Sequence, residues 1–179
     1  MPDVGGVTLL VNGNNDPGAT PPEYPTLEAA IVALGAGPGT ILIDGIVFGL
    51  NTRAAAPSIA LTGSVRITSV DPAVPAVICN SCNTTGTFNT LVFTSSAQDT
   101  IVIDNLVLFN SFITPSLACV VVDGPQDVYV ENVTLKTNAL GISAQNTLGA
   151  ASGPQLQVQR CYFDGVSEYT PPGLTNVGI

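Results

Sequence analysis

A short apolar motif occurs five times in the chain, and this repeat constrains the fold more than any other feature. The copies begin at Ile41, Val65, Ile101, Val128 and Leu156. Their starts are 24, 36, 27 and 28 residues apart. Positions one, three and six of each copy are apolar, and position five is small or polar in every copy except the last, where it is Arg160. A repeat of this length is typical of proteins whose repeats stack on one another.

Apolar and polar residues alternate within each copy, and this pattern predicts β-strands. Further strands are expected between the copies, at 58–61, 90–93, 118–122 and 141–144. Each repeat then forms one rung, and successive rungs pair in parallel about 4.8 Å apart. The long interval between the second and third copies predicts an excursion over residues 71–89.

Equivalent positions of the motif should stack in columns. At position five, Asn105 above Asn132 would make an amide ladder at a corner, and Gly45 and Ser69 fit the same bend. We expect the sixth positions to form one inward column, made of Ile46, Val70, Leu106, Val133 and Cys161.

One amphipathic helix is expected before the first copy, at 26–34. Thr26 is a favourable N-cap, Glu28 lies in the first turn, and Gly35 follows the last apolar residue. Such a helix would cover the apolar end of a stack of rungs.

The domain organisation follows from these elements. We expect an irregular lead over 1–24, the solenoid with its capping helix over 25–166, and a Pro/Gly-rich tail over 167–179. At the C-terminal end, either this tail folds over the last rung or another polypeptide covers it.

Three stretches carry a resemblance to a known family: IVIDNLVLF, VYVENVTL with the Gly-containing strand at 140–142, and YPTLEAAIVALGAGPGTILIDG. They resemble the right-handed parallel β-helix superfamily, the pectate-lyase-like fold that also occurs in viral tailspikes. The resemblance implies an all-β, right-handed parallel β-helix solenoid of about five rungs with one N-terminal capping helix. It implies little about function, because lyases, hydrolases, adhesins and structural fibres share this fold.

The composition excludes several partners. Charged residues are 9% of the chain, against roughly 25% in ordinary soluble domains, and the net charge is −9 with only four Lys and Arg. Nucleic acids are bound through many basic contacts, so we expect no nucleic-acid partner. Apolar runs are far shorter than the about 20 residues of a spanning helix, so no membrane insertion is expected. No signal peptide is seen in MPDVGGVTLL.

Acidic side chains recur at the outward fourth position, at Asp44, Asp104 and Glu131. If the chain is an enzyme, Asp104 and Glu131 on neighbouring rungs are the candidate catalytic residues of a polysaccharide lyase or glycoside hydrolase. The alternative is a solvated surface column without catalysis. We favour it because no third acid, flanking base or aromatic platform accompanies the pair.

Other catalytic and metal-binding groups are scarce. The chain has no His, which excludes Ser–His and Cys–His catalysis. Arg66 and Lys136 could be proposed as the base of a lyase, but they lie on different rungs and neither belongs to a recognisable motif. Cys79 and Cys82 form a CxxC and are weak metal candidates, since the other cysteines are single and distant. Buried thiols or a local disulfide are the alternatives, and we expect no metal and no cofactor.

The outward second positions are notably apolar, with Leu42, Val102 and Tyr129 as candidate interface residues. We expect them to pack against a neighbouring subunit or another segment of the same chain. This favours a non-catalytic structural or assembly protein. The resemblance to viral β-helices implies a virion component of the tailspike, fibre or capsid-decoration type. Its expected partners are copies of itself, with the trimer as the habit of viral spikes, and other structural subunits.

Two alternatives remain open. The first is the polysaccharide lyase or hydrolase described above. The second is a carbohydrate-binding surface adhesin, for which a surface polysaccharide would be the partner and Tyr129 the centre of binding. The expected location is the virion, or the extracellular space and cell surface.

Overall fold

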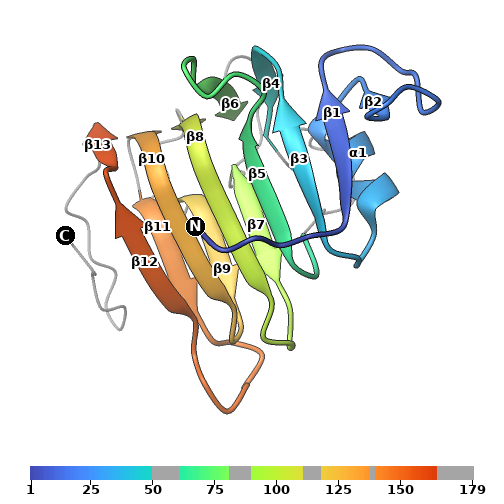
Figure 1. Ribbon diagram of the computed structural model, residues 1–179. Helices are drawn as coiled ribbons and strands as arrows, with labels where there is room; N and C mark the ends of the chain where they lie inside the picture. Colours follow the sequence, from blue (N-terminus) through green and yellow to red (C-terminus); the bar gives the residue numbers. More distant parts are fainter. Residues whose placement is uncertain (50–60, 81–89, 111–117, 138–139, 165–179) are drawn as a thin grey trace.

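The computed structural model describes residues 1–49, 61–80, 90–110, 118–137 and 140–164 of the 179-residue chain. These residues form a parallel β-solenoid of about five turns with one short helix (Figure 1). The predicted fold class, an all-β parallel β-helix, is therefore confirmed. No helix among the described residues is long and apolar enough to cross a membrane.

Each turn contains up to three strand segments. The first segments are β1 (Val7–Val11), β3 (Gly39–Ile43), β5 (Val65–Ser69), the first halves of β8 (Thr100–Asn110) and β10 (Asp127–Thr137), and β12 (Gln155–Gln159). The second segments are β4 (Ile46–Phe48), β6 (Ala76–Asn80), the second halves of β8 and β10, and β13 (Tyr162–Asp164). The third segments are β7 (Leu91–Thr94), β9 (Ala118–Asp123) and β11 (Leu140–Gln145). All of these strands pair in parallel, which stacks the turns along one axis.

The helix α1 (Leu27–Leu34) lies at the N-terminal end of the stack, against β1 and the short strand β2 (Glu23–Tyr24). Thr26 Oγ1 accepts a hydrogen bond from the backbone N–H of Ala29 at 3.1 Å, which caps the helix. Its apolar side is buried at Leu27, Ala30, Ile31 and Leu34. The helix therefore closes the first end of the core.

A corner residue divides the first and second segments in the later turns. Asn105, Asn132 and Arg160 all have positive φ, of 54°, 54° and 50°. The predicted amide ladder is present, because Asn132 Nδ2 donates to Asn105 Oδ1 at 3.0 Å. Asn is one of the few residues that adopts this left-handed conformation readily, which explains its place at the corner.

The alignment predicted for the first copy of the motif is wrong by two residues. Ile41 pairs with Ile67, and Gly39 pairs with Val65. Asp44 therefore lies outside the column of Asp104, and Gly45 lies outside the column of Asn105. A strand repeats every two residues, so a shift of two keeps the same side chains inward and the alternation alone cannot detect it.

The predicted inward column is correct in its last three members only. Leu106 and Val133 are buried, and Cys161 packs against the core below them. Ile46 and Val70 are 77% and 44% exposed. In the second turn, Ala76 pairs with Leu106 and takes the inward place, because residues 70–75 form a loop between β5 and β6. Of the excursion expected over residues 71–89, residues 71–75 belong to this loop and residues 76–80 form the strand β6 of the solenoid. Residues 81–89 lie outside the described part.

Candidate functional site

The outward side chains of the first segments form two neighbouring columns. The register gives Thr40, Arg66, Val102, Tyr129 and Gln157 in one column. It gives Leu42, Thr68, Asp104, Glu131 and Gln159 in the other. Asp104 and Glu131 are therefore on adjacent strands, as predicted, whereas Leu42 belongs to their column and not to that of Val102.

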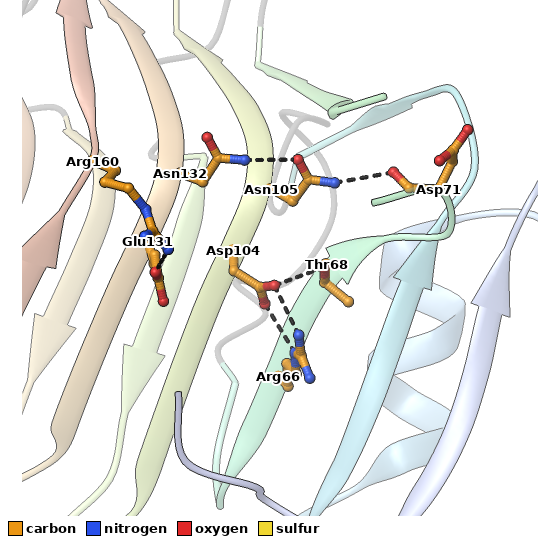
Figure 2. Close-up of polar contacts among 8 residues, drawn as sticks. All are labelled: Arg66, Thr68, Asp71, Asp104, Asn105, Glu131, Asn132 and Arg160. Carbon is orange, nitrogen blue, oxygen red and sulfur yellow. Dashed lines mark hydrogen bonds and ion pairs between the residues drawn. The ribbon is translucent and has the colours of Figure 1, made fainter. Parts of the chain in front are cut away.

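Asp104 is held by an arginine from the preceding turn. Arg66 donates from Nε to Oδ1 at 2.9 Å and from a terminal nitrogen to Oδ2 at 2.8 Å, and Thr68 Oγ1 donates to Oδ2 at 3.1 Å (Figure 2). The side chains of Arg66 and Asp104 are 37% and 14% exposed. This two-point contact fixes the carboxylate in direction as well as in charge.

The pKa of Arg66 is raised above its ordinary value. The hydrogen bond to Asp104 is the main cause, partly opposed by burial, and the charges of Asp104 and Asp3 add to it. Arg66 is thus a permanent cation, and its use as a proton-abstracting base is disfavoured. The second base that the sequence offered, Lys136, lies on a different surface, 3.9 Å from Asp164.

Glu131 is held by an arginine from the following turn. Arg160 forms an ion pair with the Glu131 carboxylate, although Arg160 itself is 73% exposed and Glu131 only 18% (Figure 2). Asp104 and Glu131, the candidate catalytic pair, are therefore each paired with a different arginine. This arrangement neutralises the column and leaves neither carboxylate as an unpaired acid or base.

The N-terminal segment crosses this surface. In Figure 1 the chain from Met1 to β1 runs over β10, β8 and β5. Met1 and Pro2 line a groove of about 280 Å³ together with Tyr129, Val130, Glu131, Gln157 and Gln159. Asp3 is close enough to Arg66 to raise its pKa. Residues 1–6 of the lead thus lie over the first sheet, whereas Val7–Val11 form its strand β1 and Glu23–Tyr24 form β2, so the lead is not irregular throughout as the sequence suggested.

Val102 lies between Arg66 and Tyr129 in this outward column. Its side chain points outward and stands apart from the main core cluster, yet its exposed fraction is 0%. Its column neighbours Arg66 and Tyr129 are the residues that the N-terminal segment approaches, the first through Asp3 and the second through Met1 and Pro2. Leu42 and Tyr129 are half-buried.

The cysteines are dispersed. Cys79 lies on the outward side of β6, Cys119 is buried in β9, and Cys161 follows β12 at the last turn. Burial raises the pKa of the Cys161 thiol, against backbone hydrogen bonds that lower it. Cys82 lies outside the described residues. Within the described part of the chain, no three His, Cys, Asp or Glu residues gather as metal ligands.

Sequence reasoning missed a second outward surface, which we call the Phe48 surface. It is made by alternate residues of β4, β6 and β8: Ile46, Phe48, Val77, Cys79, Val107 and Phe109. Ile46 and Phe48 are 77% and 66% exposed, and the other four are half-buried. The signal was available, since residues 46–48, 76–79 and 106–109 are apolar at every position and not only at alternate ones, a pattern typical of strands covered on both sides.

Comparisons of the chain with protein-family models, curated proteins and solved structures found no significant match. The class that the geometry defines is the parallel β-solenoid of about five turns.

Proposed function

We propose that this solenoid is a non-catalytic structural module that packs against other subunits through the Phe48 surface. The carrying observation is the exposure of Ile46 and Phe48, at 77% and 66%, at one end of a surface whose six members are apolar and whose columns continue on β10 as Thr134 and Lys136. An exposed group of apolar residues of this kind is typical of an interaction site. We also propose that the chain belongs to the pectate-lyase-like superfamily and that it is a virion component of the tailspike, fibre or capsid-decoration type.

The ion pairs on the first sheet support the same proposal. A hydrolase or lyase needs a carboxylate or base that can exchange a proton with its substrate. Here Asp104 and Glu131 are each engaged by an arginine. The contacts that hold these carboxylates are those of a structural column.

The proposal is tested by measuring the mass of the chain in solution over a range of concentrations. We expect a concentration-dependent oligomer, and we expect the double substitution Ile46→Ser with Phe48→Ser to remove the part of this association that runs through the Phe48 surface. Val32→Ser is the matched control, because Val32 is 71% exposed on α1 and lies outside the surface. A wild-type chain that stays monomeric at about millimolar concentration, with or without other subunits of its native particle, would contradict the proposal.

The groove beneath the N-terminal segment favours a second candidate, the binding of a surface polysaccharide. Tyr129 offers an aromatic face, and Glu131, Gln157 and Gln159 offer hydrogen-bonding groups to sugar hydroxyls. A glycan array tests this candidate. Binding that is lost in Tyr129→Ala and kept in Tyr162→Ala, an exposed tyrosine on β13, would support it.

A further inference from the structure

The C-terminal end of the solenoid presents a strand edge. Among the described residues, β12 pairs with β10 along one side and with no strand along the other. Within the described part of the chain, the edge therefore carries a row of backbone N–H and C=O groups without a strand partner, which is a template for pairing with another strand.

The side chains of this edge do not protect it. Proteins usually blunt an exposed edge with Lys, Pro or a bulge. The sequence of β12 is Gln-Leu-Gln-Val-Gln, which has no charge, no Pro and no Gly. The strand behind it, β10, carries Asp127, Glu131 and Lys136. Charge thus lies on the strand that is already paired, and the edge is neutral.

The inner side of the same end is apolar and incompletely covered. Leu156, Val158 and Cys161 are half-buried against the core, and Phe163 of β13 is 38% exposed although its partner Leu135 is fully buried. An occupant of this end must therefore supply both backbone hydrogen bonds and apolar side chains.

We propose that the occupant is a second copy of this chain, whose β12 pairs antiparallel with β12 about a two-fold axis at Gln157. This pairing is self-complementary: Gln155 lies opposite Gln159, Leu156 lies opposite Val158, and Gln157 lies opposite itself. The inner residues of both copies stay on one side of the joined sheet, so that the two cores become continuous.

Charge also favours a second copy at this place. With a net charge of −9, two copies repel one another wherever acidic residues meet. The edge strand contributes no charge, and the carboxylates beside it have partners: Glu131 is paired with Arg160, Asp164 of β13 lies 3.9 Å from Lys136, and Asp127 accepts a hydrogen bond from Gln98. Two copies of this acidic chain can therefore approach each other at the β12 edge without like charges on the two edge strands facing each other. This edge is separate from the Phe48 surface and goes beyond the proposed function.

Charge exchange at the axis tests the pairing. In Gln157→Lys or in Gln157→Glu, two like charges face each other across the axis, and we expect the dimer dissociation constant to rise roughly tenfold or more. In an equimolar mixture of the two variants, opposite charges meet, and we expect the dimer to return. Gln157 is exposed and points outward, so circular dichroism should show both variants folded.

The matched control is the same pair of substitutions at Thr62, an exposed residue in the turn before β5. Neither the Thr62 variants nor their mixture should change the dissociation constant. A Gln157 mixture that is no more dimeric than either variant alone would overturn the proposal. Ile46→Ser with Phe48→Ser should leave the end-to-end dimer intact, so failure of this inference is distinguishable from failure of the proposed function.

Discussion

The side-chain amide of Asn132 donates from Nδ2 to Oδ1 of Asn105 on the preceding turn, at 3.0 Å. Asn105 donates in its turn to the backbone carbonyl of Asp71, also at 3.0 Å (Figure 2). Both asparagines have a φ of 54°. The corner of the solenoid is thus held by side chains that accept an unusual backbone conformation and also bridge adjacent turns.

The first prediction separates these two contributions at Asn105. Asn105→Ala loses two hydrogen bonds. It also places at positive φ a residue that lacks the local side-chain hydrogen bonding by which Asn tolerates this conformation. The substitution should therefore cost about 3 kcal/mol of unfolding free energy. Asn105→Gly loses the same bonds but accepts the conformation, and it should cost about 1 kcal/mol less. Urea unfolding measures both. Equal losses would mean that the corner conformation contributes nothing.

The ladder is also the part of the structure that the sequence predicted best. An Asn at the same motif position in consecutive copies has one donor and one acceptor to share, and it tolerates positive φ, so the pattern and the chemistry agree. The placement of Asp104 beside Glu131 follows from the same alignment. The predicted alignment of the first copy is wrong because its strand begins two residues before the apolar motif, at Gly39, which pairs with Val65.

Contacts without a repeat gave no such signal. The N-terminal segment runs over β5 and β8 to reach Tyr129 on β10, and nothing in its composition predicts that contact. The arginine partners were equally hidden. Arg66 and Asp104 occupy different motif positions, and their side chains meet only because two adjacent columns and two adjacent turns bring them together.

The second prediction extends the ladder by one turn. Arg160 occupies the corner at a φ of 50°, where Asn would avoid strain and could donate to Asn132 Oδ1. Arg160→Asn removes the ion pair with Glu131. Because Arg160 is 73% exposed, this pair contributes little to the unfolding free energy. We expect a net gain of about 1 kcal/mol in unfolding free energy. A lower stability than wild type would show that the Arg160–Glu131 pair outweighs the corner.

The third prediction concerns the coupling of Arg66 with Asp104. A double-mutant cycle with Arg66→Ala and Asp104→Ala should give a coupling energy of about 1 kcal/mol, above the usual value for exposed pairs because the contact is bidentate. Arg66 is 37% exposed, so the coupling should weaken in high salt. Thr68→Val is the matched control: it removes the hydrogen bond from Thr68 to Asp104 but keeps the ion pair, so the same cycle measured in this background should give the same coupling energy. A coupling near zero would make the pair a mere surface contact.

The fourth prediction concerns pH. Burial raises the pKa of the Cys161 thiol above its ordinary value of 9.0, so the folded chain holds this proton more tightly than the unfolded chain. The resulting stability is present below pH 9.0 and is lost as the pH rises through the folded pKa. Unfolding free energy should therefore fall above that pH, and Cys161→Val should reduce this fall. A fall of the same size in Cys161→Val would assign it to other groups.

The fifth prediction concerns the N-terminal segment as the cover of Val102. Deletion of residues 1–5 uncovers a valine that is fully buried in the intact chain, and it should cost about 1–3 kcal/mol of unfolding free energy. Amide hydrogen exchange in the first half of β8 should become faster, because this surface is then open to water. Asp3→Asn is the matched control: it removes only the charge that acts on Arg66, and its effect should stay below about 1 kcal/mol.

Since the segment lies on the outer side of the sheet, Ile101 and Ile103 remain in the core, and the truncated chain should keep the circular dichroism spectrum of a β-solenoid. Unchanged exchange in β8 would mean that the segment does not cover Val102 in solution.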